Sequence, residues 1–335
     1  MRAIVTGGAG FIGCHVARAL LARDHRVLVL DDLSGGFESN IPKGAEFERW
    51  SVTDELDSLF QRFKPDAVYH LAAYAAEGLS HHIPVFNYTN NLVGTANVLG
   101  AGYRAGITHF VFTSSIAVFG HGQFKPIFSE EDECIPCDPY GVAKLACENH
   151  IRVFHDYYHR PSYTIFRPHN VFGPNQNISD PYRNVVGIFM KKAMASEPLP
   201  VFGDGSQTRS FSYITSVAEC IAQAPCVPAA KDQLFNVGGD EPMSVKDLAG
   251  HVSRILGKKE NLQFLPARHE VAHAHADHSR VRSAFPEAFA GSPDIVEGLR
   301  LMVEWVKSNP APAVTECPSR IEIMDQLPPS WAARV

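Results

Sequence analysis

The chain has no excess of positive charge and no long apolar run. Its 30 lysines and arginines are outnumbered by 36 aspartates and glutamates, which gives a net charge of −6. It therefore lacks the basic surface that would attract nucleic acid or an acidic membrane. No basic and apolar leader precedes the first predicted strand, and no run approaches the length of a membrane-spanning helix. We expect a cytoplasmic protein with no nucleic-acid partner and no membrane partner.

The cysteines are scattered and odd in number, which argues against a disulfide framework. There are seven of them, and we expect free thiols. Cys134 and Cys137 form a CxxC pair, but no second pair of ligands stands at zinc-finger spacing. A histidine-rich segment, 269–278, has mixed charge and no regular pattern, which favours a solvated loop over a metal centre. No bound metal is expected.

The beginning of the chain predicts a strand, a tight turn and a helix. Apolar residues 3–5 lead into Gly7, Gly10 and Gly13, after which apolar residues recur with a helical period. The glycines let the turn close and let a pyrophosphate approach the backbone, while the helix N-terminus offers unpaired N–H groups to phosphates. This half of a βαβ unit could bind a dinucleotide.

An acidic pair follows the second predicted strand, residues 26–30. It stands about 20 residues beyond the glycines, where a carboxylate meets the ribose hydroxyls of adenosine. Because Asp31 and Asp32 would repel a 2′-phosphate, they predict NAD rather than NADP. The alternative is a turn followed by surface acids, and the order of strand, glycines, helix, strand and acid argues against it.

Strands alternate with helices through the first half of the chain, which predicts an α/β fold with a doubly wound parallel sheet. Residues 67–71, 110–113 and 163–166 should be strands, and 87–105 and 140–157 helices. After Arg167 the prolines, glycines and short elements predict a smaller, loop-rich α/β substrate domain. We expect a Rossmann-like NAD-binding domain at 1–165 with a returning segment at about 205–235, a substrate domain at 166–204 and 236–320, and an extended tail at 321–335.

A second group of residues could move a proton. Tyr140 and Lys144 are four residues apart, so they would face the same side of a helix. A nearby ammonium and a cationic nicotinamide ring would lower the pKa of the phenol by favouring the phenolate. Ser115 ends a predicted buried strand, at the edge where doubly wound folds place their ligands. Tyr140 could act as a base toward a substrate hydroxyl, and Ser115 could hydrogen-bond the same oxygen.

Together these motifs resemble the extended short-chain dehydrogenase/reductase family, and within it the NAD-dependent epimerases and dehydratases of the UDP-glucose 4-epimerase type. The resemblance covers nearly the whole chain. It implies NAD as the cofactor and a nucleotide sugar as the substrate. The matching segments, in order, are residues 7–13, 31–34, 70–73, 113–120, 140–144, 167–174 and 202–209.

The resemblance also implies a role for each matching residue. Ser115, Tyr140 and Lys144 would be catalytic. The cofactor would be bound by Tyr140 and Lys144 and by Gly7, Gly10, Phe11, Ile12, Gly13, Asp31, Asp32, Leu33, Ser34, Gly35, Ser51, Val52, Leu71, Ala72 and Ala73. The substrate would be bound by Ser115 and by Glu77, His169, Asn170, Asn184, Val185, Val201, Phe202, Arg209 and Arg268. The guanidinium groups of Arg209 and Arg268 suit paired phosphate oxygens. For Arg268, an ordinary surface salt bridge is the alternative interpretation.

Three positions depart from the family pattern. Ser51 stands where many relatives have an aspartate that touches the adenine, Glu77 where a small apolar residue is common, and His169 where an aromatic residue or serine is frequent. A buried Glu or His near the sugar could recognise its hydroxyl groups by hydrogen bonding or adjust proton transfer. For each residue, a purely structural hydrogen bond is the alternative. These departures leave the hexose open.

We expect epimerisation at C4 of a nucleotide-activated hexose, with UDP-glucose and UDP-galactose, or their N-acetyl or uronate relatives, as substrates. The alternatives are a 4,6-dehydratase, decarboxylase or reductase on the same fold, or a non-catalytic dinucleotide-binding scaffold. Resembling dehydratases have an Asp-Glu pair, and resembling decarboxylases a Glu, where this chain has Ile116 and Ala117. Neither side chain can exchange a proton, which favours the epimerase.

The resemblance further implies a homodimer. In the family, the helices corresponding to 87–105 and 140–157 pack as a four-helix interface. Their apolar residues could equally belong to the core of one chain. The residues in question are Leu92, Val98, Leu99, Leu145 and Val153.

Overall fold

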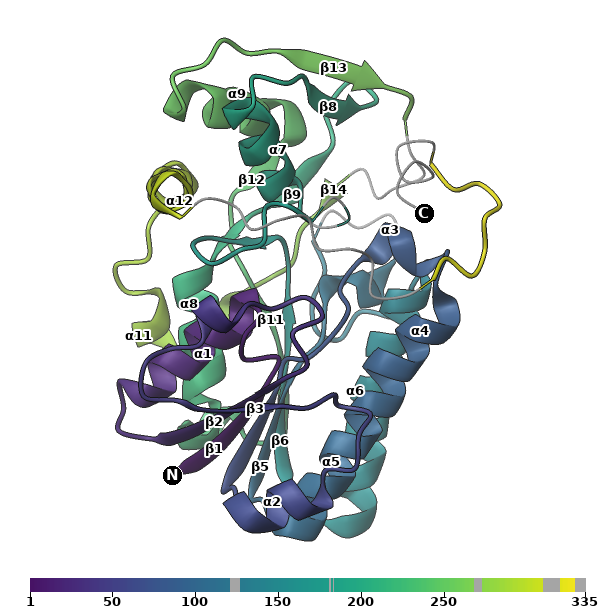
Figure 1. Ribbon diagram of the computed structural model, residues 1–335, viewed down its shortest axis with the longest axis vertical. Helices are drawn as coiled ribbons and strands as arrows, with labels where there is room; N and C mark the ends of the chain where they lie inside the picture. Colours follow the sequence, from purple (N-terminus) through teal and green to yellow (C-terminus); the bar gives the residue numbers. More distant parts are fainter. Residues whose placement is uncertain (121–126, 181, 183, 268–272, 310–319, 329–335) are drawn as a thin grey trace.

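A seven-stranded parallel sheet forms the centre of the molecule (Figure 1). The structure, a computed structural model, describes residues 1–120, 127–180, 182, 184–267, 273–309 and 320–328. The strand order is β11-β6-β5-β4-β1-β2-β3, which confirms the predicted doubly wound α/β fold. The strands are β1 (Arg2–Thr6), β2 (Arg26–Asp31), β3 (Glu46–Arg49), β4 (Ala67–His70), β5 (His109–Thr113), β6 (Ser162–Pro168) and β11 (Gln233–Val237).

Helices cover both faces of the sheet because successive residues of each strand point to opposite sides. In β1, Ala3 and Val5 pack into the cluster beneath α1 (Phe11–Leu21) and α8 (Ile214–Gln223). Ile4 packs on the other face, in the cluster beneath α2 (Asp57–Phe63), α5 (Gly94–Ala105) and α6 (Pro139–Tyr158). These three residues at the centre of β1 are fully buried, so the strand is apolar on both faces.

The predicted helix over 87–105 consists of three consecutive pieces. They are α4 (Pro84–Tyr88), a π-helical turn (Thr89–Val93) and α5. The predicted boundary after residue 165 lies inside β6, and β11 returns from the second half of the chain to pair with β6.

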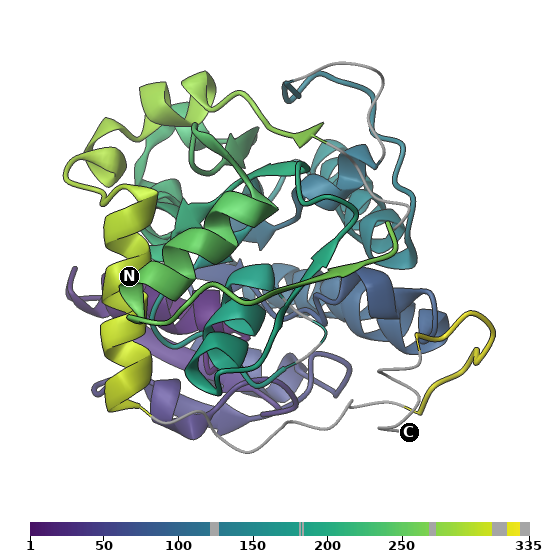
Figure 2. The same ribbon diagram turned by 90° about the horizontal axis from the view of Figure 1, so that it is seen from above.

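A smaller lobe lies beyond the carboxyl ends of the strands (Figures 1 and 2). Its core contains Phe189, Met190, Leu248 and Met302, all fully buried. Its helices are α7 (Val185–Met194), α9 (Val245–Ile255) and α12 (Ile295–Ser308), and its strand pair is β8 (Leu199–Phe202) with β13 (Leu262–Leu265). The remaining short elements are α3 (Glu77–Ser80), β7 (Val171–Phe172), β9 (Thr208–Ser210), β10 (Ser212–Tyr213), β12 (Pro242–Ser244), β14 (His273–Ala274), α10 (Ser279–Ala284) and α11 (Pro286–Phe289).

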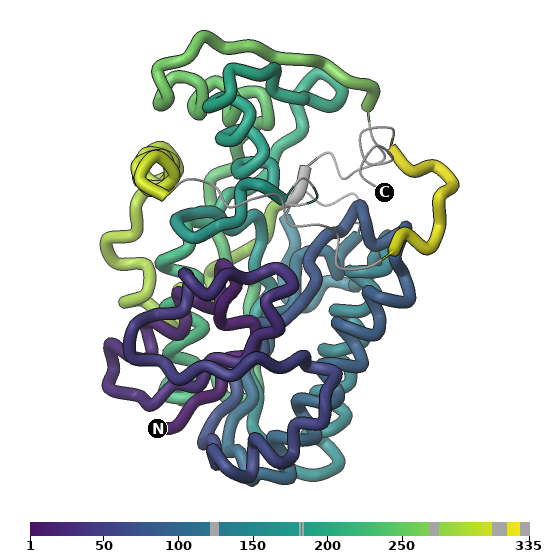
Figure 3. The backbone as a smooth tube through the Cα atoms, viewed as in Figure 1, coloured from purple at the N-terminus to yellow at the C-terminus, as the bar shows by residue number. Residues whose placement is uncertain are grey.

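The described part of the predicted tail, residues 321–328, lies beside α3 and α4 (Figure 3). The rest of the tail, Arg268 and the start of the histidine-rich segment lie outside the described residues. Within the described ranges every cysteine is a free thiol, and no cluster of three or more potential metal ligands occurs. No helix in those ranges is long and apolar enough to cross a membrane.

Candidate active site

One cavity of about 1220 Å³ opens at the carboxyl ends of the strands. The strand order reverses between β1 and β4, and doubly wound folds bind their ligands at such a switch point. The cavity extends from the glycine turn after β1, past the ends of β4 and β5, to α7 and β9 of the smaller lobe. It therefore joins the predicted dinucleotide site to the predicted substrate site.

The turn after β1 forms a cradle that only glycine fits. Gly7 has a φ of +70°, and a Cβ there would lie 2.6 Å from the backbone nitrogen of Ala72. A Cβ on Gly13 would lie 2.1 Å from the carbonyl oxygen of Gly7. Gly10 is the N-cap of α1 and provides no side-chain cap, and residues 10–13 at this end of the helix line the cavity. These residues fit the pyrophosphate of a dinucleotide.

Asp31 fastens this cradle to the end of β2. Its carboxylate accepts the Ala9 N–H at 3.0 Å and the Leu33 N–H at 2.9 Å. Burial raises the pKa of Asp31, the backbone hydrogen bonds oppose that shift, and the charge of Asp32 adds to it. Asp32 is less buried and accepts the Ser34 N–H at 2.8 Å. Both acids line the cavity, as a ribose-binding pair must.

The predicted catalytic residues come together on the sheet side of the cavity. Ser115, Tyr140 and Lys144 all line it, and none is more than 8% exposed. Lys144 Nζ donates to the carbonyl of Thr113 at 2.8 Å and lies 5.8 Å from the centre of the Tyr140 ring. Burial lowers the pKa of Lys144 to about 8. Ser115 is the N-cap of a short 3₁₀ turn, and its hydroxyl oxygen accepts the Ala117 N–H at 3.1 Å.

The position of Tyr140 follows from how α6 begins. The Asp138 carboxylate accepts the Gly141 N–H at 2.8 Å and caps the helix, with a proline at the next position. The Tyr140 N–H donates to the Ser80 hydroxyl at 3.2 Å. A Cβ on Gly141 would lie 2.6 Å from the Ala117 carbonyl, so only glycine lets the helix approach the end of β5 this closely.

A buried ion pair behind α6 ties the helix to the sheet. Glu148 of α6 is fully buried and accepts two hydrogen bonds from Arg167 of β6, at 2.9 and 2.7 Å. Ser114, at the end of β5, donates to the same carboxylate at 2.6 Å. Paired and hydrogen-bonded in this way, the two charges hold α6, β5 and β6 in register. The sequence motifs did not reveal this pair.

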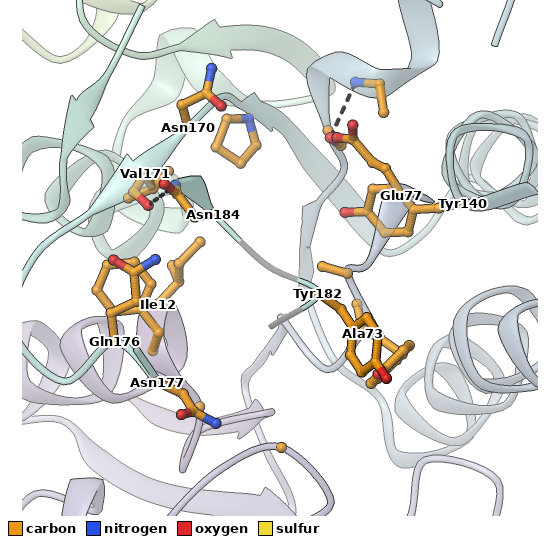
Figure 4. Close-up of a pocket in the computed structure, with 18 of the residues that line it drawn as sticks. Ile12, Ala73, Glu77, Tyr140, Asn170, Val171, Gln176, Asn177, Tyr182 and Asn184 are labelled. Atoms are coloured by element: carbon orange, nitrogen blue, oxygen red, sulfur yellow. Dashed lines mark hydrogen bonds between the residues drawn. The ribbon is translucent and has the colours of Figure 1, made fainter. Parts of the chain in front are cut away.

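Figure 4 shows the two sides of the substrate end of the cavity. Glu77 and Tyr140 lie on one side, and Asn170 and Asn184 lie on the other. Asn170 has a φ of +44° and donates to the Ser210 carbonyl at 3.1 Å. Asn184 caps α7, since its side-chain oxygen accepts the Val186 N–H at 2.8 Å and its nitrogen donates to the Val171 carbonyl at 2.9 Å.

Most of the predicted binding residues line the cavity. On the cofactor side they are Gly7, Gly10, Phe11, Ile12, Gly13, Asp31, Asp32, Ser34, Gly35, Val52, Leu71, Ala72 and Ala73. On the substrate side they are Glu77, Asn170, Asn184, Val185, Phe202 and Arg209. Tyr74, His81, Gln176, Asn177 and Tyr182 also line it, and sequence reasoning missed them because they belong to no motif.

Four predicted residues are not brought to the cavity. Leu33 adopts a φ of +64° and contributes its N–H to Asp31. The Ser51 hydroxyl turns toward Thr53, at 2.9 Å. Val201 is fully buried in the core of the smaller lobe, because its neighbour Phe202 takes the cavity-facing side of β8.

His169 is the fourth predicted residue that does not line the cavity, and its side chain contacts another histidine instead. Its Nε2 lies 2.6 Å from Nε2 of His278, whose Nδ1 is 2.8 Å from the Asp240 carboxylate. Only 2% of His169 is exposed, and burial lowers its pKa to about 3. The neighbouring Gly238 makes room for this ring, since a Cβ there would lie 2.3 Å from it. Its neighbour Asn170 lines the cavity, whereas His169 does not.

Comparisons with known proteins agree with this geometry. A UDP-glucose 4-epimerase of Mycolicibacterium smegmatis is 33% identical over 321 residues, which cover 92% of this chain and 99% of that protein. UDP-glucuronic acid decarboxylase 2 of Arabidopsis thaliana is 30% identical over 82% of this chain and 61% of that protein. The solved structure of a UDP-glucose 4-epimerase from Thermotoga maritima with UDP-glucose has a TM-score of 0.86 and 29% identity, covering 92% of this chain and 99% of that chain.

Residues 3–238 match the NAD dependent epimerase/dehydratase family. This match confirms both the predicted family and the predicted cofactor. The cradle after β1, the acids after β2 and the Ser115, Tyr140 and Lys144 group all lie within the matched range. The chain therefore belongs to the NAD dependent epimerase/dehydratase family, and its cofactor is NAD.

Proposed function

We propose that the protein inverts the configuration at C4 of a UDP-activated hexose, with UDP-glucose and UDP-galactose as its substrates. The observation that carries this proposal is the cavity itself. The cavity is lined by the buried Tyr140 and Lys144 pair and by the glycine turn after β1. The two residues that follow Ser115 in the cavity lining have no acidic or basic side chain. The similarity to UDP-glucose 4-epimerases supports the choice of sugar.

The residues of this chain would carry the proton. Bound NAD would supply reversible hydride transfer at C4 of the sugar. Tyr140 would take the proton of the 4-hydroxyl, and the Lys144 ammonium would stabilise the resulting phenolate. Below about pH 8 the ammonium is present despite its burial. The Ser115 hydroxyl would hydrogen-bond the same sugar oxygen and keep it near Tyr140.

Holding the nucleotide while the sugar turns is a second requirement of this reaction. Arg209 lines the cavity in the smaller lobe, and its guanidinium suits paired phosphate oxygens. Asn170 and Asn184 lie across the cavity from Tyr140. The anchor for the nucleotide and the base for the sugar thus come from opposite sides of one cavity of about 1220 Å³.

Ile116 and Ala117 argue against dehydration and decarboxylation. Both line the cavity directly after Ser115, and neither side chain can exchange a proton. Loss of water from C5 and C6 would need both an acid and a base there. Glu77 could supply one of these functions from another direction, but one carboxylate does not readily supply both.

The test is to incubate the purified protein with UDP-galactose and follow the sugar by proton NMR, with UDP-N-acetylglucosamine and UDP-glucuronate in parallel. We expect UDP-glucose, with no loss of water or carbon dioxide. A persistent 4-keto-6-deoxy sugar, or a pentose from UDP-glucuronate, would contradict the epimerase. If NAD stays bound and no sugar of this panel is converted, the scaffold alternative gains support.

We also propose that two copies associate through α4 and α6. Val98 and Leu99 of the predicted interface are buried in the core, so they are not available for it. Val153 of α6 is 66% exposed, and Tyr157 on the same helix is 77% exposed. Val85 of α4 is 68% exposed, and Val93 of the π-helical turn is 54% exposed. A second copy would cover these exposed apolar side chains.

Light scattering of the full chain at micromolar concentration tests the dimer. We expect a mass of twice 36.8 kDa for the wild-type protein and of 36.8 kDa for Val153→Glu. Val296→Glu is the matched control, because Val296 is 41% exposed on α12, away from α6. A wild-type mass of a single chain would reject the dimer.

A further inference from the structure

A C-terminal strap, defined here as residues 320–328, crosses one wall of the cavity. That wall segment, residues 74–86, contains α3 and the start of α4, and it precedes the strap by about 240 residues in the chain. Figures 1 and 3 show the yellow strap beside α3 and α4. Sequence reasoning could read no function from this tail.

Glu322 joins the strap to the first turn of α4. Its two carboxylate oxygens accept the N–H groups of Val85 at 2.8 Å and Phe86 at 2.9 Å. These N–H groups belong to the start of a helix, where no partner exists within the helix itself. A negative charge is also favourable at a helix N-terminus. The strap therefore supplies the cap that α4 lacks in its own sequence.

His82 makes a second connection between the strap and the wall. Its carbonyl accepts the N–H groups of Glu322 at 2.8 Å and Ile323 at 3.2 Å. In the other direction, Nδ1 of His82 is 2.9 Å from the carbonyl oxygen of Ile323. The backbone of the strap is thus paired with one residue of the loop between α3 and α4.

Ile321 buries the apolar side of the strap. It is 8% exposed and packs in a cluster with Tyr74, Leu79 and Ile83 of the wall. Tyr182, from the smaller lobe, packs against the same cluster. Both tyrosines also line the cavity. The strap therefore shares one apolar cluster with two side chains that also line the cavity.

A hydrogen-bonded path leads from this wall to the catalytic tyrosine. The Ser80 hydroxyl donates to the Glu77 carbonyl at 2.6 Å and accepts the Tyr140 N–H at 3.2 Å. Ser80 is fully buried, so water does not compete for these bonds. The strap is paired with His82, only two residues further along the chain. Fixing the loop at His82 therefore limits the movement of Ser80 and Glu77.

We propose that the strap is a positioning element of the substrate site: Glu322 and Ile321 hold the wall that presents Tyr74 and Glu77 to the sugar. This inference rests on the proposed function, since it takes the sugar to lie beside Tyr140. Helices of four and five residues have little stability of their own. Without the strap, the wall would sample other positions. Part of the binding free energy of the sugar would then be used to order the wall, and the apparent affinity would fall.

The first experiment measures the wall itself and requires no activity. Hydrogen exchange is compared between wild type, Glu322→Ala, Glu322→Gln and Met324→Ala in the full chain loaded with NAD. We expect faster exchange of the amides over 77–90 in Glu322→Ala and partial protection in Glu322→Gln, which keeps one acceptor oxygen. Met324 is 55% exposed on the same strap, so its variant should match wild type. Equal exchange in all four proteins would overturn the proposal.

The second experiment separates sugar binding from nucleotide binding. Calorimetry measures the Kd of UDP-glucose and of UDP in a Tyr140→Phe background, where turnover cannot interfere. Glu322→Ala should weaken UDP-glucose about tenfold, the size expected from losing charge-assisted hydrogen bonds. The Kd of UDP should stay within about twofold, because UDP lacks the sugar that we propose lies beside the wall.

The outcomes distinguish the strap from the proposed function. Equal weakening of both ligands, or of neither, would show that the strap only stabilises the fold and would overturn the positioning role. Ile321→Ala offers an independent variant, and it should repeat the pattern of Glu322→Ala. If UDP-glucose does not bind wild type at all, the proposed substrate is wrong, and the exchange comparison still decides whether the strap holds the wall.

Discussion

The two sides of the cavity are held in place by different kinds of interaction. On the sheet side, the glycine turn and Ser115 directly follow strands β1 and β5, each hydrogen-bonded to a neighbour on both sides. On the wall side, α3 and α4 have only four and five residues. Side chains from elsewhere in the chain hold the backbone of the wall. Asn91 accepts the N–H of Tyr74, which precedes α3, at 2.8 Å, and Glu322 caps α4.

From this difference we expect the sheet side to determine the reaction and the wall side to determine how tightly the sugar is bound. The sheet side has many cooperative hydrogen bonds, so a single substitution there should change the reaction or the cofactor without moving the backbone. The wall side depends on a few side-chain contacts, so a single substitution there should change how tightly the sugar binds. Variants of the two sides can therefore break or sharpen the comparison.

The largest effect is expected for Tyr140→Phe on the sheet side. Removing the phenolic oxygen removes the base that we propose, which should lower kcat by about a hundred- to ten-thousand-fold. The NAD content should not change, because the ring and its packing remain. Proton NMR of sugar conversion measures the rate, and the matched control is Tyr182→Phe, which removes a phenolic oxygen from the cavity lining of the smaller lobe. Comparable losses in both variants would contradict the separation.

The same division explains how much of the molecule the sequence could predict. Alternating apolar strands and helices predicted the sheet, because a buried parallel strand requires apolar residues on both faces. β3 is half exposed, with the sequence Glu-Phe-Glu-Arg, and its apolar signal is correspondingly weak. On the sheet side, local spacing was sufficient, since Tyr140 and Lys144 occupy one helix and Asp31 ends one strand.

The wall side could not be predicted in this way. Glu322 caps α4 from a distance of 236 residues, and no local period encodes such a contact. Val201 and His169 show a second limit. Val201 adjoins one family motif and His169 lies within another, yet neither side chain lines the cavity. A motif places the backbone, whereas the alternation along a strand and the packing behind it decide which side chain reaches the ligand.

The second prediction concerns the cofactor. Asp31→Ala should weaken NAD binding by on the order of 1.5 to 3 kcal/mol, because a buried, charged hydrogen-bond partner is lost. Part of this loss would arise because the Ala9 N–H loses the carboxylate that accepts its hydrogen bond in the wild type. Calorimetry with NAD-free protein measures it, and Asp32→Ala, at the more exposed acid, should have the smaller effect. A wild-type preference for NADP would refute the argument from the acidic pair.

The third prediction uses the burial of Lys144. Its pKa is lowered from 10.5 to about 8, so above pH 8 the unfolded chain binds a proton that the native chain has released. Stability contributed by this group therefore rises with pH, by at most about 1.4 kcal/mol per pH unit. Lys144→Met lacks this contribution.

Urea unfolding at pH 8 and pH 9 provides the measurement. The free energy of unfolding of wild type should increase relative to that of Lys144→Met between the two values. His150→Gln is a control for titration elsewhere on α6, because burial lowers the pKa of that histidine and it is already neutral at pH 8. A constant difference between wild type and Lys144→Met would mean that Lys144 titrates outside this range.

The smallest effect is expected for Glu77→Gln on the wall side. Glutamine keeps the length and hydrogen-bonding capacity of glutamate but cannot exchange a proton. If Tyr140 alone carries the proton, the rate should change by less than about fivefold, far below a lost general base, and the product should remain the C4 epimer. Proton NMR of the sugar reports both. Elimination would need a second acid or base near Glu77, and Ile116 and Ala117 supply neither. A wild-type elimination product that disappears in Glu77→Gln would instead assign the wall a part in the chemistry and end the separation between the two sides.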